Sequence, residues 1–467
     1  MTIPGTEATD LPRIEGRSPR IAMLVYNDAE NDARVLKEAA AARDAGAEVR
    51  ILAVARDLVG RHAGVSTRLG GVELSRVQEF TMAAYLPWIA PLTRRLAGAT
   101  RPRPGGAPTQ QARRDAPSSP GETRPRPRAL ARARSRAVRL LADVGDRTFR
   151  TVALAHYWRL AVQDLLHWRP DIVHANDGNT LLPAVLAARF LGAGCVYDSH
   201  ELWRHRNIRQ DRLLAPHVEA IIESWAIRRV DAVITVSPSI VRWLQSRYAL
   251  PEAPALVRNV PAAAPMPTPE HGRLRELAGL SASTRVIAYG GRITSSRGLE
   301  EVLHALPLLP EGVHLVMLGY GESTYLDPLW QLARDLRVED RVHRVGPVAP
   351  SEVSTALADG DVSVVHVRPD VLSYEFALPN KLFESIRGGL PIAAADLPDI
   401  RGVVTELGVG RLFEGDDPAD LARTIEAILA DPTTYREAAR RAAPQMIWER
   451  ESAVLIDVYR RVLARRP

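Results

Sequence analysis

Short apolar runs alternate with amphipathic segments of helical length, and this alternation constrains the fold more than any other feature of the chain. The first half carries such runs at 20–26, 49–55, 171–175, 195–199 and 231–237. A second series follows at 285–291, 314–319, 341–346, 361–367 and 390–396. Buried strands separated by helices are typical of parallel, doubly wound sheets with helices on both faces.

A proline-rich stretch, PAAAPMPTPEHG at 261–272, separates the two series as an interdomain linker does. We therefore predict an α/β protein with two tandem Rossmann-like domains that face each other across a cleft. The expected boundaries are a disordered tail at 1–18, a first domain at 19–262, a linker at 263–272 and a second domain at 273–445. The helical segment 446–467 offers Trp448 and Tyr459 as anchors, and we expect it to pack back on the first domain.

Composition excludes several classes of protein. A single cysteine, Cys195, cannot form an internal disulfide, so a secreted protein framed by disulfides is excluded. No apolar run approaches the ~20 residues that span a bilayer. The first ten residues, MTIPGTEATD, are acidic and polar, unlike a signal peptide. We expect a cytoplasmic location.

The net charge of +6 comes from one segment. Thirteen arginines but only two acids lie between Arg94 and Arg139, so the remainder of the chain is mildly acidic, and we expect no nucleic-acid partner. Within this segment, about 97–136 is a mixture of Pro, Gly and Arg that predicts a disordered insertion. We interpret it as a solvated linker; the alternative is a polybasic arm in weak contact with a membrane surface.

The segment GGRITSSRG at 290–298 follows the first strand of the second series. Gly290 and Gly291 allow a ligand to approach the backbone, and Arg292 and Arg297 place two cations at the start of the next helix. This arrangement predicts a site for a diphosphate; the alternative is a plain glycine turn with solvated arginines. The segment lacks the GxGxxG and GxxxxGK[ST] fingerprints, which weakens a dehydrogenase or a P-loop kinase.

The segment YEFALPNKLFESIRGGLP at 374–391 predicts a helix that starts near Pro379. Its first turns would present Asn380, Lys381 and Glu384, with Lys381 facing phosphate and Glu384 accepting hydrogen bonds from a ribose. Lys381 is one of only two lysines beside fifty-nine arginines. The alternative is an amphipathic helix with solvated charges.

Polar side chains also follow the strands of the first domain, where they would meet a polyhydroxylated or polar acceptor. The acceptor-binding candidates are Asn27, Asn31, Asp32, Arg34, His174, Asp177 and Glu201, with His200 beside them. For any one histidine of this group, a structural role is the alternative. No CxxC or HExxH occurs, and we predict no metal site.

Taken together, these segments resemble the GT-B glycosyltransferases, and within them the retaining family 4 that uses nucleotide sugars. The resemblance covers nearly the whole chain. It rests on the ordered series NDARVLKEA, IVHAND, YDSHE, VITVSPSI, RNVP, GGRI with RG, LGYGE, RVHRVGPV, DVSVV and LPNKLFESIRGGLPI. The resemblance implies two facing Rossmann-like domains, a nucleoside-diphosphate sugar as donor and a small polar or glycan acceptor.

By this resemblance, Arg292 and Arg297 hold the donor diphosphate, Glu384 binds the ribose, and His200 lies near the sugar and the acceptor; Arg292, Arg297 and His200 are the catalytic candidates. The remaining donor-binding candidates are Gly291, Gly319, Gly321, Val348, Glu375, Phe376, Leu378, Pro379, Asn380 and Lys381. Gly319 and Gly321 would lie in the loop after the second strand, and the main chain near Val348 would meet the base.

Two positions depart from the family pattern. Arg297 replaces a lysine, which keeps the cation. Phe376 stands where the first Glu of the E-x7-E motif would contact the donor sugar, and the nearest carboxylate is Glu375. Either Glu375 shifts register, or the site accepts a modified sugar of the kind found in natural-product pathways, which is our hypothesis.

The resemblance also implies retention of anomeric configuration, with the donor diphosphate accepting the proton and neither a cofactor nor a metal required. The donor would be a UDP or GDP sugar. Alternatives are a cell-envelope or polysaccharide glycosyltransferase near the membrane, a nucleotide-sugar epimerase, and a non-catalytic nucleotide-sugar-binding protein. A dinucleotide oxidoreductase comes last because its glycine fingerprint is missing.

Overall fold

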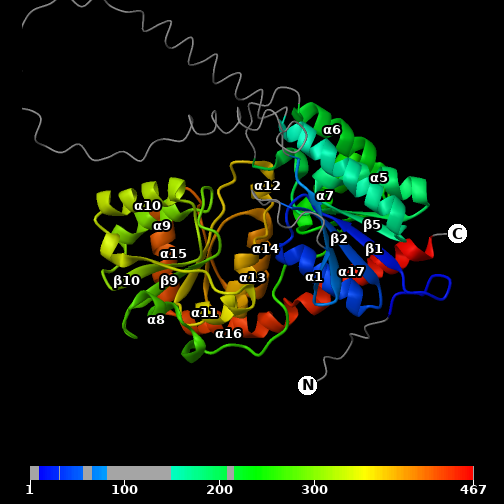
Figure 1. The fold of residues 1–467 in the computed structure, drawn as a ribbon. Coiled ribbons are helices and arrows are strands. Elements are labelled where there is room, and N and C mark those ends of the chain that lie inside the picture. Colours follow the sequence, from blue (N-terminus) through cyan, green and yellow to red (C-terminus); the bar gives the residue numbers. More distant parts are fainter. Residues whose placement is uncertain (1–9, 31, 56–65, 81–148, 208–214, 466–467) are drawn as a thin grey trace, which may run out of the picture.

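The computed structural model describes residues 10–30, 32–55, 66–80, 149–207 and 215–465. The described chain forms two α/β units, one around an eight-stranded sheet and one around a six-stranded sheet (Figure 1). The predicted fold class, two doubly wound units, is confirmed. The expected insertion at 97–136 lies outside the described residues.

The sheet of the first unit has the order β3-β4-β2-β1-β5-β6-β7-β8. Its strands are β1 (Arg20–Leu24), β2 (Glu48–Ala55), β3 (Ser66–Leu69), β4 (Val72–Gln78), β5 (Ile172–Asn176), β6 (Gly194–Ser199), β7 (Ala232–Thr235) and β8 (Ala255–Leu256). All neighbours pair in parallel except β3 and β4, which form an antiparallel edge hairpin. This hairpin was not among the expected strands.

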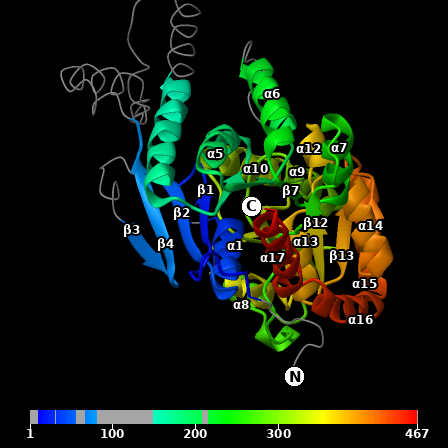
Figure 2. The ribbon, with the colours of Figure 1, turned by 90° about the vertical axis from the view of Figure 1, so that its right-hand side faces the viewer.

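Helices cover both faces of this sheet (Figures 1 and 2). On one face lie α1 (Ala33–Asp44) and α17 (Trp448–Ala464); on the other lie α5 (Gly178–Leu191), α6 (Ala215–Ala226), α7 (Pro238–Tyr248) and the helical residues 149–168. Along β1, Ile21 and Met23 join the cluster that includes α1, whereas Ala22 and Leu24 join the cluster that includes α5. Because alternate side chains of a strand point to opposite faces, a continuous apolar run serves both helical layers.

The sheet of the second unit is parallel throughout, with the order β11-β10-β9-β12-β13-β14. Its strands are β9 (Arg285–Gly290), β10 (Val313–Leu318), β11 (Val342–Val345), β12 (Val362–Val365), β13 (Ile392–Ala395) and β14 (Gly410–Phe413). Its helices are α8 (Leu274–Ala278), α9 (Leu299–Ala305), α10 (Ser323–Asp335), α11 (Val353–Leu357), α12 (Leu372–Glu375), α13 (Asn380–Arg387), α14 (Pro398–Leu407), α15 (Pro418–Ala430) and α16 (Pro432–Ala442).

Short 3-10 helices occur along the described chain in both units. They are η2 (Trp203–His205), η3 (Ile227–Arg229), η4 (Pro269–His271), η5 (Leu306–Leu308), η6 (Glu339–Arg341), η7 (Pro350–Glu352) and η8 (Ala443–Gln445).

The chain passes between the units twice. Residues 261–268 leave the first unit without regular secondary structure, and α17 returns to it after η8. The Trp448 backbone N–H donates to the carbonyl of Pro261 at 2.8 Å, and the buried Glu451 accepts from the backbone and Nε of Arg258 at 2.8 and 2.9 Å. The last helix is therefore fixed to the point where the chain first leaves this unit.

Residues 10–18, which we expected to belong to a disordered tail, are ordered. The Leu11 side chain is buried, and its backbone N–H donates to the carbonyl of Ala45 at 2.8 Å. Arg17 forms an ion pair with Asp171 at 2.7 Å. The expected tail is thus too long by these residues, because one apolar side chain and one ion pair attach the segment to the first unit.

Among the helices of the described ranges, none is both long enough and apolar enough to cross a membrane.

The return of α17 generates a stability prediction. Trp448 is 7% exposed, and its ring lies 4.9 Å from the Lys37 ammonium. Because truncation of a buried tryptophan leaves a large cavity, we expect Trp448→Ala to lower the free energy of unfolding by about 3–5 kcal/mol. Val454 on the same helix is 38% exposed, so Val454→Ala should cost at most about 0.5 kcal/mol. Urea unfolding measures both, and equal losses would contradict this packing.

Candidate functional site

The two units touch where strands β6 and β7 end. The Leu202 backbone N–H donates to Ser373 Oγ at 3.0 Å, and Ser237 Oγ donates to the carbonyl of Phe376 at 2.8 Å. Ser239 donates through its backbone N–H and its hydroxyl to the Asp399 carboxylate, at 3.1 and 2.9 Å. The segment after β6, together with the residue that caps α7 and the first turn of that helix, therefore contacts α12 and α14 of the second unit.

His200 is positioned by three polar side chains. Its Nε2 lies 3.2 Å from Asn176 Oδ1 and 3.2 Å from Asp198 Oδ2, and its Nδ1 lies 3.4 Å from Asp177 Oδ2. Burial alone would lower the pKa of this imidazole, but the carboxylates of Asp177 and Asp198 raise it to about 10. At neutral pH His200 is therefore a cation that donates hydrogen bonds, and it is not a general base.

Arg34 and His174 lie deeper than the sequence suggested. Arg34 is 4% exposed and forms two hydrogen bonds to the Asp198 carboxylate, at 2.8 and 3.0 Å, and a third to the carbonyl of Val257 at 2.7 Å. His174 is fully buried, and its Nδ1 lies 2.7 Å from the Tyr459 hydroxyl. Burial lowers the pKa of His174 to about 4, so the ring is neutral. Both side chains serve the interior of the first unit and do not face an acceptor.

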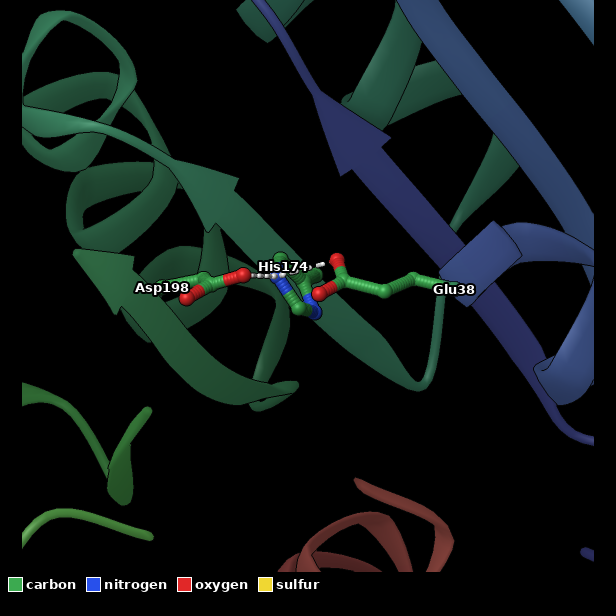
Figure 3. A group of neighbouring side chains, drawn as sticks. All are labelled: Glu38, His174 and Asp198. Carbon is green, nitrogen blue, oxygen red and sulfur yellow. Dashed lines mark ion pairs between the residues drawn. The ribbon is translucent and has the colours of Figure 1, made fainter. Parts of the chain in front are cut away.

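Glu38, His174 and Asp198 have the geometry of a metal site, with one ligand atom from each lying within 4.8 Å of the others (Figure 3). The Arg34 guanidinium lies against this group, 3.0 Å from Glu38 and 2.8 Å from Asp198. Burial raises the pKa of Glu38 well above its usual range, with Arg34 opposing this rise, whereas Arg34 keeps the pKa of Asp198 low in spite of its burial. The guanidinium therefore supplies the positive charge that a metal ion would bring.

In the second unit, two loops after neighbouring strands pack closely at glycines. Gly319, after β10, has a φ of 155°, and a Cβ there would lie 1.9 Å from the carbonyl oxygen of Gly291, after β9. A Cβ on Gly321 would lie 2.5 Å from the carbonyl oxygen of Ile293. Side chains at these positions would push the loops apart, so the glycines are required for this arrangement.

Arg292 and Arg297 differ in their surroundings. Arg292 is exposed and forms an ion pair with the exposed Glu322 at 2.9 Å. Arg297 is half-buried, and its guanidinium lies 5.4 Å from the centre of the Tyr374 ring. Arg297 is therefore the less exposed of the two cations, whereas Arg292 is the one that forms an ion pair.

Helix α13 begins after Pro379 and carries Lys381 into the interior. The Lys381 ammonium donates to the carbonyl of His366 at 2.6 Å and lies 4.9 Å from the Tyr289 ring centre. Burial, with a smaller contribution from Arg297, lowers the pKa of Lys381 well below its usual range. An anion beside these two groups would favour the protonated lysine.

Glu384, one turn further along α13, faces the first unit. Burial raises its pKa to about 7, and Lys37 of α1 partly opposes this rise. Lys37 donates to Asn259 Oδ1 at 2.5 Å and to the carbonyl of Val260 at 2.8 Å, and burial lowers its pKa to about 8. The two helices thus bring a carboxyl and an ammonium group together from different units.

A second electrostatic link between the units joins Glu201 to Arg297. Burial and the neighbouring Asp177 raise the pKa of Glu201 to about 7, while Arg206, His200 and Arg297 lower it. The acceptor-side and donor-side candidates are therefore close enough to influence each other's charge.

Phe376 follows α12, and its side chain packs against the apolar cluster of the first unit, as does Leu372. Its carbonyl is held by Ser237, and Glu375 is the last residue of the helix. Phe376 also lines an open hollow of about 630 Å³ between α7 and α14, together with Arg242, Trp243 and Pro398. The aromatic residue thus contacts the facing unit.

The remaining candidate residues differ in their contacts and in their burial. Asn27 donates to Asp32 at 2.8 Å, and Asp32 caps α1, so both residues shape the loop after β1. Val348 is half-buried, Leu378 is buried and Asn380 is exposed. Asn31 lies outside the described residues.

Sequence reasoning missed Lys37, Glu38, Asp198 and Tyr459. Lys37 had a usable signal, because it is one of only two lysines in the chain. Asp198 stands in YDSHE, two residues before His200 and near the end of the expected strand. Tyr459 was predicted as an anchor, but nothing in its local sequence indicates a hydrogen bond to a residue 285 positions away.

Comparison with known proteins agrees with this arrangement. The model described as "Glycosyltransferase Family 4" matches residues 99–259, and the model described as "Glycosyl transferases group 1" matches residues 284–431. One model therefore falls on each side of the proline-rich crossing.

Two relatives have the same level of identity. A D-inositol 3-phosphate glycosyltransferase from Xylanimonas cellulosilytica is 28% identical over 314 residues, which cover 64% of this chain and 73% of the relative. A glycogen synthase from Mycobacterium tuberculosis is 28% identical over 305 residues, which cover 62% of this chain and 69% of the relative.

Solved structures show the same fold. Sucrose-phosphate synthase from Thermosynechococcus elongatus superimposes with a TM-score of 0.66 at 16% identity, covering 96% of this chain and 99% of that one. HepE from Anabaena, solved in complex with UDP-glucose, superimposes with a TM-score of 0.61 at 15% identity, covering 94% and 98%. With both units matched by family models, the chain is a glycosyltransferase and belongs to the family 4-like group of the GT-B glycosyltransferases.

Proposed function

We propose that the protein transfers a sugar from a nucleoside-diphosphate sugar to a hydroxyl-bearing acceptor, with retention of configuration and with protein cations in place of a metal. The observation that carries the proposal is the group formed by Arg297, Lys381 and Glu384 of the second unit, which interacts electrostatically with Glu201 and Lys37 of the first. A donor held by the first group would be reached by an acceptor held by the other unit. HepE, which shares the fold, is solved with UDP-glucose, a donor of this class.

Each side chain then has a defined task. Arg297 and the protonated Lys381 would stabilise the charge that develops on the leaving diphosphate, with Arg292 as a second, more exposed cation. Glu384 would accept hydrogen bonds from the ribose hydroxyls. His200, a cation held by two carboxylates, would donate to an oxygen of the transferred sugar or of the acceptor. The acceptor proton would leave on a diphosphate oxygen, so no protein base is needed.

Arg297 provides the main test of this function. Removal of one preorganised cation from a leaving group typically costs 100- to 1,000-fold in rate, so we expect Arg297→Ala to lower turnover by about that factor. The assay uses the UDP or GDP sugar whose nucleoside diphosphate raises the melting temperature most, and it follows release of that diphosphate together with a glycosylated product.

Arg441, exposed and paired only with Glu437 at 3.9 Å among the described residues, provides the matched control, and Arg441→Ala should keep normal turnover. If no nucleoside diphosphate stabilises the protein, or if Arg297→Ala turns over normally, the proposal fails. Free nucleotide without a glycosylated acceptor would indicate hydrolysis, and a changed sugar still attached to the nucleotide would indicate an epimerase.

The titration of Glu384 predicts a pH dependence. Its pKa is raised to about 7, so the carboxylate that accepts from the ribose forms as the pH rises through 7 and is lost below it. We therefore expect the contribution of this carboxylate to nucleoside-diphosphate affinity, measured by calorimetry, to fall as the pH decreases from about 8 to 6. Because Glu384→Gln retains the shape but cannot titrate, it should bind more weakly at pH 8 and lose most of this dependence. An unchanged pH profile in this variant would refute the assignment.

Phe376 supports a narrower proposal about the sugar. An aromatic ring in place of a carboxylate removes a hydrogen-bond acceptor for sugar hydroxyls, which favours a donor with fewer hydroxyls or with apolar substituents, as in natural-product pathways. We expect the protein to prefer such a donor over the unmodified hexose, and Phe376→Glu to shift the kcat/KM ratio toward the unmodified hexose by about tenfold or more.

Glu375→Ala is the matched variant, and it should leave donor preference unchanged. Full activity with unmodified UDP-glucose that disappears in Glu375→Ala would show instead that Glu375 takes the place of the family carboxylate.

A further inference from the structure

One face of α6 is apolar and exposed. Val218, Ile221 and Trp225 are 52%, 70% and 37% exposed, and their spacing of three and four residues places them on one side of the helix. Helix α5 lies beside α6 in both views and carries Leu186 and Phe190, which are 50% and 79% exposed (Figures 1 and 2). Five of the large apolar side chains exposed on the described surface thus lie on two neighbouring helices of the first unit.

Arginines surround the end of this face. An open hollow of about 550 Å³ is lined by Ile221 and Trp225 together with Arg204, Arg228, Arg229 and Arg247. The Arg229 guanidinium lies 4.4 Å from the Trp225 ring centre and donates to the carbonyl of Trp225 at 2.6 Å. We call this surface, Val218, Ile221, Trp225 and the four arginines, the α6 face.

No described carboxylate forms a direct ion pair with the arginines of the α6 face. Within the described part of the chain, none of its four guanidinium groups lies within ion-pairing distance of a carboxylate. The acids of α6 are engaged elsewhere: Glu219 pairs with Arg206 at 3.1 Å, and the buried Glu223 accepts from the Tyr248 hydroxyl at 2.6 Å. The face therefore presents cations and apolar side chains without a direct ion pair, and the buried Glu223 acts on Arg204 only through space.

This combination fits a lipid surface. Apolar side chains of an interfacial helix enter the boundary between headgroups and acyl chains, tryptophan favours that depth, and arginines reach lipid phosphates while their stems stay apolar. We propose that the α6 face docks on an anionic phospholipid bilayer. The charge complementarity commits the proposal to anionic lipid, and it does not rest on the proposed catalytic function.

Docking would bring the loop that carries His200 and Glu201 close to the membrane surface. Arg204 of the α6 face belongs to η2, which begins three residues after His200. The loop that carries His200 and Glu201 therefore leads directly to the docking surface.

Vesicle co-sedimentation of the full chain tests the proposal. We expect binding to vesicles of phosphatidylcholine with phosphatidylglycerol, little binding to phosphatidylcholine alone, and weaker binding at high salt. Ile221→Asp, and separately the double variant Arg228→Glu with Arg229→Glu, should each lower the partition coefficient by about tenfold or more. The controls Leu308→Asp and Arg344→Glu alter exposed residues of the second unit and should bind like the unchanged chain.

Three results would overturn the proposal. The first is binding that does not depend on phosphatidylglycerol. The second is undiminished binding by both sets of α6 variants while their melting temperatures stay normal, which would assign binding to another basic segment such as 97–136. The third is self-association, measured by sedimentation velocity, that Ile221→Asp abolishes, because the face would then bind a second copy. The double arginine variant changes only exposed side chains, so it provides the test even if Ile221→Asp fails to fold.

Discussion

The buried guanidinium of Arg34 is the interaction on which the first unit and its site depend. A permanent cation removed from water is tolerated only where carboxylates and carbonyls satisfy it, and here Asp198 and the carbonyl of Val257 do so. Asp198 also lies 3.2 Å from His200 and helps to keep that imidazole protonated. One carboxylate therefore fixes α1 against the strand ends and helps to set the charge of His200, which follows β6.

The two lysines have a related role. Arginine keeps its proton even when it is buried, whereas lysine can lose it, so the two residues are not equivalent inside a protein. In a chain with fifty-nine arginines, both lysines are buried wholly or in part, both have lowered pKa values, and each lies beside an arginine. Lysine thus occurs where the local positive charge can change with protonation, on α1 facing α13 for Lys37 and inside the second unit for Lys381.

The sequence predicts the layered fold because strands buried on both faces appear in it as short, continuous apolar runs, which differ from the polar segments typical of loops. The hairpin β3–β4 was not predicted, because β4 at the sheet edge alternates polar and apolar residues and contains no continuous apolar run. That polar side chains gather near the ends of these strands was also predictable, but not their exact places or directions, because Arg34 lies in α1, His174 lies within β5, and only His200 follows a strand. Whether such a side chain turns inward or outward depends on partners such as Asp198 and Tyr459, which tertiary packing supplies from distant segments.

The double passage of the chain has a consequence for recombination between relatives. The second unit is contiguous in sequence, yet it is bounded by two crossings, at 261–268 and near η8, and α17 beyond them belongs structurally to the first unit. A chimera that exchanges only the second unit therefore needs two junctions. With a single junction, α17 would come from the other relative. Tyr459, Glu451 and Trp448 would then be lost together with their contacts to His174, Arg258 and Pro261 of the first unit.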